Sequence, residues 1–476
     1  MLFASTVFLL VFLPAAIVCY YTQRALLGNR LRNGVLLVFS YLFYAYGAAE
    51  FVLILLSSTA ADYLLGLLIE KQRRHAKWWV GISVLVNLVV LAYFKYANFL
   101  VAEVSQCLAT LGFPPIGDWV AVSLPIGISF FTFQKLSYII DIHRRQVSAL
   151  TRFVDFALYV AMFPQLVAGP IVRFKDICAQ LGKRLESWEQ FYLGAMRFCW
   201  GLSKKVFIAD ACGQVADAVF GLDLAMLDTK TAWLGAIAYT MQIYFDFSAY
   251  SDMAIGLARL FGFELRENFN RPYAAVSMTD FWRRWHISLS TWFRDYLYIP
   301  LGGNRKGSAR TALNLLLVFT LCGLWHGANW TFIAWGLYHG LFLGLERATV
   351  IRNWHPRRWV IGRRLATFLL VVFGWVLFRA DSIGTAAMFA QAMLVPSDLP
   401  LSFELFQVMN HRNIVFMLIA AIAVIGAPRL PKIERVLHTE GPLRSVVSAV
   451  MLLLILPYCA GTILAGAANP FIYFRF

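Results

Sequence analysis

Two histidines among apolar residues are the strongest candidates for chemistry in this sequence. His326 lies between the apolar segments 312–325 and 328–345, and His286 follows two arginines in a tryptophan-rich run, 282–286. Histidine exchanges protons near neutral pH, and an ionisable side chain within a long apolar stretch is costly enough to indicate a function. Both histidines are therefore candidate catalytic residues.

Each histidine also has a structural interpretation. The alternative for His326 is a neutral side chain hydrogen-bonded between helices, although Gly323, Gly327 and Gly336 leave room for backbone or substrate to approach closely. The alternative for His286 is an interfacial residue on a basic helix. Spacing alone leaves both interpretations open.

A second group of ionisable residues lies in the apolar run 244–252. Asp246 and Asp252 are six residues apart, which is about 600° on a regular helix, so they lie on different faces. They are not expected to form an acid–base pair. Each is predicted instead to anchor a histidine or arginine, or to cap a helix break. No metal-binding motif appears, and no metal site is predicted.

The composition shows what must position these residues. Of the 476 residues, 60% are hydrophobic and 14% are charged, whereas soluble domains are about a quarter charged. The mean hydropathy is +0.65. The net charge of +16 comes from short Lys and Arg runs between apolar segments, which suits loops facing anionic lipid. The composition therefore predicts a polytopic membrane protein and no nucleic-acid partner.

The apolar segments predict an all-α integral membrane protein with one domain, residues 1–476. A spanning helix needs about 20 mostly apolar residues. Because several candidate segments are short or carry polar residues, we expect about 11 true spans, with the other segments re-entrant or interfacial. The candidates are 2–21, 33–48, 51–69, 78–95, 119–140, 153–169, 190–208, 231–260, 312–325, 328–345, 365–379, 414–427 and 445–467.

The loops between these segments predict an orientation. Lys and Arg are concentrated in loops 22–32, 70–77 and 143–152 and again in 352–364, whereas loop 96–118 contains none. Because Lys and Arg favour the cytoplasmic side, these four loops are predicted to be cytoplasmic. The N-terminus and loop 96–118 are then periplasmic.

One long polar segment, 263–310, holds no candidate span. Within it, Phe281, Trp285, Trp292 and Tyr296 recur at helical spacing, with arginines on other faces. This pattern predicts an amphipathic helix that lies in the interface plane or packs under the bundle. A turn at 302–305 is predicted to end it.

Several blocks of this sequence match a known family in order, almost from end to end. The matching blocks are Phe94–Phe99, Leu124–Phe130, Ala168–Phe174, Tyr244–Gly256, Phe281–Asn304, Gly323–Trp335 and Phe471–Phe474. Through these blocks the sequence resembles the membrane-bound O-acyltransferase family, in particular its bacterial alginate and cellulose O-acetyltransferases. The resemblance implies a helical bundle of about 11 spans around a thin centre, with His326 as the essential histidine and His286 as the second invariant one.

The resemblance also implies a mechanism. Acetyl-CoA, or another acetyl thioester, would approach from the cytoplasm as a co-substrate, with no bound cofactor. His326 would act as general base on an acceptor hydroxyl, and a covalent acyl-histidine is the alternative. The candidate substrate-binding residues are Trp325 and Asn329, which flank His326, and Arg283 and Arg284, which would neutralise phosphates of the donor.

The expected setting is the bacterial inner membrane, in contact with membrane lipid. The expected partners are a periplasmic acetyltransferase of the same pathway and a polysaccharide synthase or secretion complex. A D-alanyl transferase of teichoic acid synthesis is one alternative, because that branch shares the 282–286 block. A non-enzymatic export component is another, but it would leave the two histidines unexplained. The runs 171–174 and 302–305 look more like the polysaccharide acetylators.

Overall fold

The computed structural model describes residues 1–348, 359–400, 402–426, 436–437, 439, 441–466 and 470–472. These residues form helices and connecting loops with no strand among them, which confirms the all-α prediction. They divide into two compact units, Met1–Phe191 with Leu257–Leu265 and Tyr192–Gly256 with Arg266–Phe476. The organisation as one domain stays a prediction.

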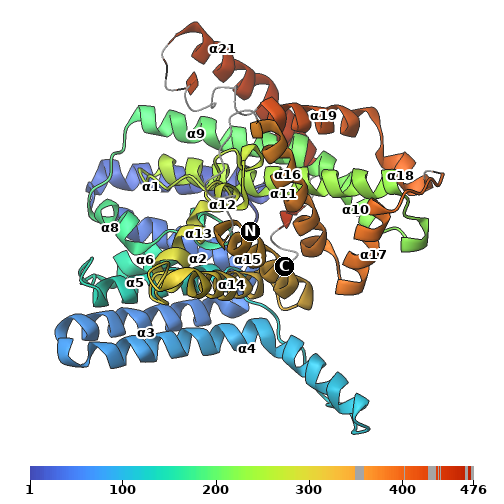
Figure 1. The fold of residues 1–476 in the computed structure, drawn as a ribbon. Coiled ribbons are helices and arrows are strands. Elements are labelled where there is room, and N and C mark those ends of the chain that lie inside the picture. The colour runs from blue at the N-terminus through green and yellow to red at the C-terminus, as the bar shows by residue number, and fades with distance from the viewer. Residues whose placement is uncertain are drawn as a thin grey trace. The chain divides into compact units, whose positions relative to one another are not determined.

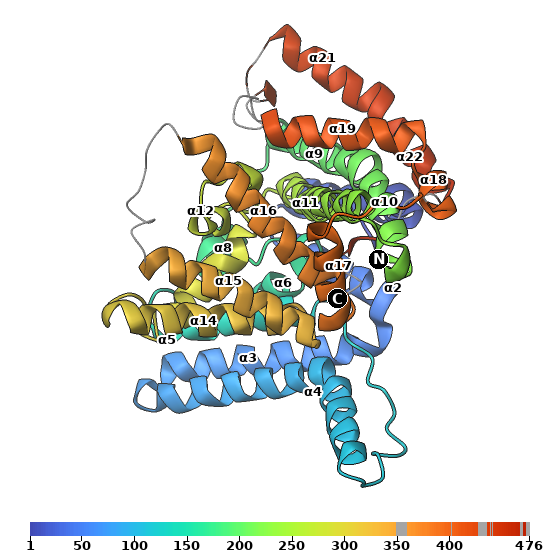
Figure 2. The same cartoon turned by 45° about the vertical axis from the view of Figure 1, so that its right-hand side comes forward.

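The first unit is built from long antiparallel helices. α3 and α4 run side by side, and α4 extends beyond the end of its neighbour (Figures 1 and 2). With 35 residues, α4 is about 52 Å long, which exceeds the roughly 30 Å of bilayer hydrocarbon. The helices of this unit are α1 (Leu13–Leu27), α2 (Arg32–Ala48), α3 (Val52–Lys71), α4 (Ala76–Thr110), α5 (Ile128–His143), α6 (Phe153–Ala161), α7 (Phe163–Leu166) and α8 (Phe174–Gly182).

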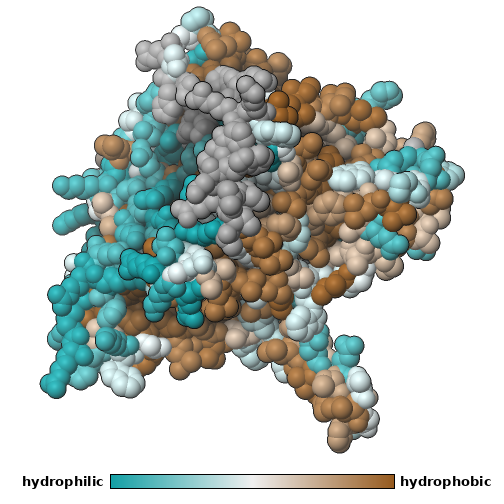
Figure 3. All heavy atoms as spheres, viewed as in Figure 1, coloured by the Kyte–Doolittle hydropathy of each residue, from teal (hydrophilic) through white to brown (hydrophobic). Residues whose placement is uncertain are grey.

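Six helical segments of the described chain are long and apolar enough to cross a membrane. Large apolar side chains on them are exposed, for example Leu53 at 73% and Leu85 at 63%. Hydrophobic residues cover much of the face in Figure 3, while hydrophilic residues gather on one side of it. The molecule is therefore a membrane protein, and the count of about 11 spans stays a prediction. The six segments are Phe8–Leu27, Arg32–Lys71, Arg73–Thr110, Gly307–His326, Val360–Arg379 and Pro442–Leu464.

Two candidate spans of the first unit are shorter than the sequence predicts. In the candidate 119–140 the helix α5 begins only at Ile128, after a proline and a glycine. In the candidate 153–169 the helix α6 ends after nine residues, about 14 Å, too short to span. Its continuation is broken at Met162, before Pro164 in the first turn of α7, because proline cannot take part in the hydrogen bonds of a helix interior.

The second unit contains both candidate histidines. Its most closely packed pair is α14 and α15, which lie side by side in both views (Figures 1 and 2). Its helices are α9 (Trp188–Ser203, from Tyr192 onward), α10 (Asp210–Phe220), α11 (Thr229–Leu260, up to Gly256), α12 (Met278–Trp282), α13 (Ile287–Phe293), α14 (Gly307–His326), α15 (Trp330–Ala348), α16 (Val360–Arg379), α17 (Ile383–Leu394), α18 (Phe403–Val408), α19 (His411–Gly426), α21 (Pro442–Val450) and α22 (Leu456–Leu464).

Glycines allow α14 and α15 to approach closely. A methyl group added to Gly323 would lie 2.1 Å from the carbonyl oxygen of Phe332, and one on Gly336 would lie 2.3 Å from that of Phe319. One added to Gly327 would lie 2.1 Å from the ring of Phe332. The space at these glycines is thus filled by neighbouring backbone and a ring. Small residues serve helix packing in membranes in this way.

The prediction of one amphipathic helix over 281–296 is wrong in one respect, because the structure has separate helical segments there. α12 ends at Trp282 and α13 begins at Ile287, and a π-helical segment η7 (Arg294–Tyr298) follows. The cause is His286, whose φ of 41° and ψ of 56° lie in the left-handed region. The helical spacing of the aromatic residues in the sequence therefore does not reveal the break, because the pattern is the same on both sides of the turn. The predicted turn at 302–305 is confirmed by positive φ angles at its two glycines.

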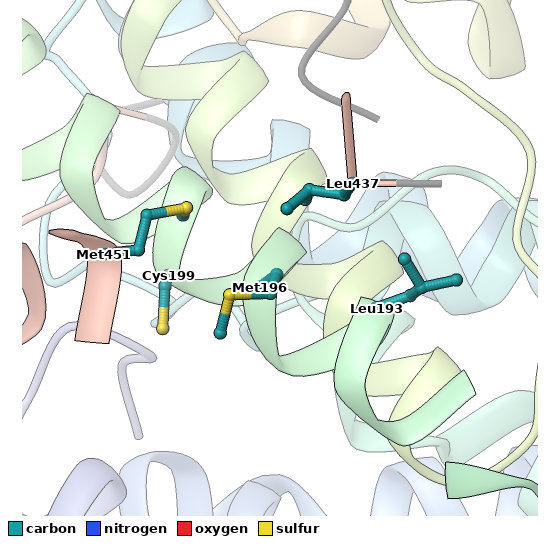
Figure 4. Packing of buried hydrophobic residues seen from close by; sticks show 5 residues of the cluster. All are labelled: Leu193, Met196, Cys199, Leu437 and Met451. Carbon is teal, nitrogen blue, oxygen red and sulfur yellow. The ribbon is translucent and has the colours of Figure 1, made fainter. Parts of the chain in front are cut away.

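Apolar side chains join α9 to the C-terminal part of the second unit. Leu193, Met196 and Cys199 of α9 pack with Leu437 and Met451 (Figure 4). All five are at most 5% exposed. This cluster fixes α9, whose Arg197 takes part in the buried ion pairs described below.

Candidate functional site

His326 is the last residue of α14 and lies among aromatic rings. Its ring centroid is 4.8 Å from that of Trp325 and 5.2 Å from those of Trp335 and Phe378. The residue is 8% exposed. An imidazole in such an apolar enclosure is held in place by packing and is separated from bulk water.

The structure brings the second histidine to the first. His286 lies at the turn between α12 and α13, and its ring centroid is 6.5 Å from that of His326. It is fully buried, with its ring 4.7 Å from Phe247 of α11 and 6.1 Å from Trp325. Residues 40 apart in sequence therefore share one apolar enclosure, close enough for both imidazoles to contact one small bound group.

Asn268 holds the turn that presents His286, and sequence reasoning missed it. Its carbonyl accepts from the Ile287 backbone N–H at 2.9 Å. Its side-chain Oδ1 accepts from the backbone N–H and the hydroxyl of Ser288, at 3.2 and 2.8 Å. Its Nδ2 donates to Ser251 of α11 at 3.1 Å. The sequence did not indicate a role for Asn268, because a polar residue in a loop is common and these hydrogen bonds form only in the folded turn.

Burial sets the protonation of His286. Loss of solvent around the imidazole lowers its pKa to about 3. Near neutral pH the ring is therefore uncharged, and it is a weak proton acceptor, since a good general base has a pKa close to the working pH. This favours a positioning or hydrogen-bonding role for His286 over that of the main base.

A cavity of about 420 Å³ is lined by sequence neighbours of the two histidines, although neither histidine is among its described lining residues. Its lining includes Ile287, which follows His286, and Cys322, which lies one helical turn before His326. Arg283 also lines it, with Arg294 and Arg347. The cavity thus combines apolar walls with cationic side chains and lies in the usual size range of small-molecule sites.

The two arginines predicted to bind the donor lie in different surroundings. Arg283 is exposed and lines the cavity. Arg284 is not among the described lining residues, and its Nε is 2.8 Å from an oxygen of Asp280, four residues earlier. The structure therefore brings Arg283, but not Arg284, to the cavity.

The two predicted substrate-binding residues beside His326 also differ. Trp325 is buried against both histidine rings. Asn329 instead caps α15, because its Oδ1 accepts from the Thr331 N–H at 2.9 Å and its Nδ2 donates to the Asp381 carbonyl at 3.1 Å. With both side-chain atoms engaged in the protein, Asn329 has a structural role here.

The carboxylates of α11 have separate partners. Asp246 lies 2.8 Å from Lys205 and accepts from the Ile472 backbone N–H at 2.6 Å. Asp252 pairs with Arg197 and Lys204, each at 2.5 Å. Asp252 thus anchors an arginine, as predicted, whereas Asp246 anchors a lysine instead of the predicted histidine or arginine. Neither carboxylate caps a break, since α11 is continuous. The terminal block Phe471–Phe474 is anchored through its first two residues, and its last two lie outside the described residues.

The described part of the chain contains no group of three or more His, Cys, Asp or Glu residues that could hold a metal ion. The cavity with cationic residues is lined by neighbours of both histidines in the sequence. The chemistry that the histidine pair supports is proton transfer by imidazole in an apolar enclosure. Acyl transfer needs this combination, because the acceptor must lose a proton while water stays excluded.

Comparison with known proteins gives consistent similarities. A family model described as MBOAT, membrane-bound O-acyltransferase family, matches residues 41–379. A probable alginate O-acetylase of Pseudomonas putida is 43% identical over 100% of this chain and 100% of that protein. One of Pseudomonas aeruginosa is 48% identical over 83% of this chain and 75% of that protein. A peptidoglycan O-acetyltransferase of Helicobacter pylori is 36% identical over 83% of this chain and 80% of that protein.

Proposed function

Because this chain belongs to the membrane-bound O-acyltransferase family, we propose that it supplies acetyl groups for the O-acetylation of an exopolysaccharide such as alginate. The observation that carries the proposal is the pairing of the buried side chains of His286 and His326 in one apolar enclosure. The similarity to probable alginate O-acetylases supports acetyl as the group transferred and a polysaccharide as its destination.

In this proposal His326 is the general base. It takes the proton of the acceptor hydroxyl while the hydroxyl oxygen attacks the thioester carbonyl. The carbon–sulfur bond then breaks, and the departing thiolate takes the proton from the imidazolium. General base catalysis of this kind contributes about 10²–10⁴ in rate. His286 stays neutral and orients the donor or the acceptor.

The donor is acetyl-CoA or another acetyl thioester from the cytoplasm. The cavity of about 420 Å³ suits the thioester end of such a donor, and the exposed Arg283 at its lining suits a phosphate farther along. The apolar enclosure protects the thioester from hydrolysis. A bound cofactor plays no part in this scheme.

The acetyl group passes to a periplasmic acetyltransferase partner before it reaches the polymer. A histidine that is 8% exposed among aromatic rings can admit one hydroxyl side chain, but not every sugar along an extended polymer. Transfer to a hydroxyl of a partner avoids this constraint. The partner and a polysaccharide synthase or secretion complex would work together with this protein in the inner membrane.

The first test replaces the proposed base. His326→Ala should abolish acetyl transfer from radioactive acetyl-CoA while folded protein remains in the membrane. His339→Ala is the matched control, because His339 is also fully buried in the same aromatic cluster and accepts a hydrogen bond from Trp282. We expect it to lower thermal stability and keep measurable transfer. Wild-type transfer by His326→Ala would remove this residue from the mechanism.

The second test separates relay from direct acetylation. The purified protein is reconstituted in liposomes with acetyl-CoA and alginate, with and without the periplasmic acetyltransferase. Acetylation of the polymer that appears only with the partner supports the relay. Efficient acetylation without it would contradict the relay and leave the acetyl transfer itself intact.

A further inference from the structure

Three arginines surround one carboxylate in the first unit. Glu186, in the loop between α8 and α9, lies 2.5 Å from the Nε of Arg24, 3.3 Å from Arg32 and 3.7 Å from the Nε of Arg184. Its carboxylate also accepts from the hydroxyl of Tyr20 at 2.5 Å. We call Arg24, Arg32, Arg184 and Glu186 the arginine cluster.

The arginine cluster carries more positive than negative charge. In the described part of the chain, Glu186 is the one acidic partner of each of its three arginines. Three guanidinium groups and one carboxylate give a net charge of +2, from 3 − 1. The side chains of Arg32, Arg184 and Glu186 are at most 5% exposed, so water can compensate little of the net charge of +1 that these three carry, whereas Arg24 is 39% exposed. Buried charge is unfavourable unless it is paired, which indicates that a further anion belongs here.

The need for a further anion is clearest at the guanidinium group of Arg184. Its side chain is fully buried, and its three nitrogens have no hydrogen-bond acceptor among the described residues. The guanidinium lies over the ring of Phe263, 4.3 Å from the centroid. Burial, followed by the charge of Arg32, holds the pKa of Arg184 below its ordinary value. This is the signature of a cation whose counter-ion is incomplete.

The cluster lies where two spanning segments meet the membrane surface. Arg24 is in the last turn of α1, and Arg32 is the first residue of α2. The neighbouring Leu26 is 76% exposed and Trp188, just after Glu186, is 86% exposed. An exposed tryptophan near the end of a span is typical of the level of the lipid headgroups, and the exposed leucine suits contact with the adjoining lipid.

One arginine of the cluster is open to a ligand from that level. Arg24 is 39% exposed, and its nearest approach to Glu186 is through its Nε. Its terminal nitrogens form no other hydrogen bond among the described residues, so they are available as paired donors. A guanidinium fork of this kind matches the oxygens of a phosphate.

We propose that the arginine cluster binds the phosphate of an anionic phospholipid, with Arg24 in direct contact and Arg32 and Arg184 supplying the buried positive charge. The Lys and Arg pattern of loop 22–32 assigns this lipid to the cytoplasmic leaflet. Basic pockets at the ends of spanning helices on the cytoplasmic side bind anionic headgroups in this manner. The proposal is independent of the acetyl-transfer function, because it involves residues outside the histidine site.

The test titrates the full-length protein in a neutral detergent with phosphatidylglycerol or phosphatidylcholine and measures bound lipid by native mass spectrometry. We expect phosphatidylglycerol to bind in preference to phosphatidylcholine. Arg24→Gln should weaken phosphatidylglycerol binding about five-fold, the effect of one arginine at a membrane surface. Arg24→Lys keeps the charge but loses the paired donors, so it should bind phosphatidylglycerol more weakly than the wild-type protein and more strongly than Arg24→Gln. Equal binding of the two lipids by the wild-type protein would overturn the proposal without any variant.

Arg73→Gln is the matched control. Arg73 is 34% exposed, follows the end of the span α3 and pairs with one acid, Glu70, so it resembles Arg24 in exposure and setting. An equal loss of lipid in both variants would show general charge attraction and overturn the assignment to the cluster. A second arm adds inorganic phosphate in place of the lipid. If inorganic phosphate displaces the lipid fully at an equal concentration, the site binds free phosphate and the assignment to a phospholipid is wrong.

Discussion

His286 combines an unusual backbone conformation with complete burial. A left-handed conformation at a residue other than glycine is uncommon, and it persists only where the surroundings hold it. Here Asn268 supplies that support from both its backbone and its side chain. The direction in which His286 points is thus decided by a residue 18 positions away in the sequence.

We predict that Asn268→Ala lowers kcat about ten-fold or more, because it displaces the His286 imidazole from the position in which it orients the reacting groups. Asn413→Ala is the control, since Asn413 is also fully buried and its Nδ2 donates to Gln214. Steady-state kinetics and thermal unfolding are measured for both. A loss of stability in Asn268→Ala with kcat intact would mean that Asn268 is only structural.

Protonation of His286 leads to a prediction about pH. Its folded pKa of about 3 lies below the ordinary value of about 6.5, so the unfolded state binds the extra proton. Stability should therefore fall as the pH drops below about 6.5 and continue falling toward pH 3. His286→Asn removes this titration, and asparagine tolerates the left-handed backbone. The unfolding temperature of this variant should depend less on pH between 7 and 5, and equal dependence would contradict the buried neutral histidine.

The close contact of α14 and α15 determines where His326 lies. His326 ends α14, while Trp335, which packs against its ring, belongs to α15. A change in the distance between these helices therefore changes the enclosure of the proposed base. The glycines at the contact are packing residues in the structure, although their spacing in the sequence equally suited a substrate approach.

Two glycines of α15 give a matched test of this contact. Gly336→Ala should be strongly destabilising, since the added methyl group would lie 2.3 Å from backbone oxygen on α14. Gly344→Ala should be nearly neutral, because its methyl group would be 3.5 Å from Ala312. The amount of folded protein in membranes and its unfolding temperature are compared. Equal stability of the two variants would contradict the tight packing.

The whole molecule is organised by the membrane, and its orientation is testable. The predicted loop 96–118 is wrong in its first part, because residues 96–110 belong to the continuous helix α4. We predict that segment 70–77 is cytoplasmic and that segment 96–118 is periplasmic, from the distribution of Lys and Arg. A cysteine at Lys77 should resist a membrane-impermeant maleimide in intact cells. One at Gln106, in a background without other exposed cysteines, should react. The opposite labelling pattern would reverse the orientation of the chain. The predicted loop 352–364 lies largely outside the described residues.

The sequence by itself determined the class of the molecule. Its apolar composition, long apolar runs and family blocks predicted an all-α membrane protein of the membrane-bound O-acyltransferase family, and the family comparison and the structure confirm both. These properties depend on residue types and on their order along short segments, so they can be predicted without knowing which distant residues are in contact. The sequence also drew attention to His286 and His326, because ionisable groups are costly within apolar runs.

Only the tertiary structure decided how these residues are used. The 6.5 Å between the two histidine rings and the support of His286 by Asn268 follow from contacts between residues distant in the sequence. The break at His286 within a regular helical pattern also depends on such contacts. Periodicity records which face a side chain occupies, whereas a strained turn and its partners are set by packing and hydrogen bonds across the fold.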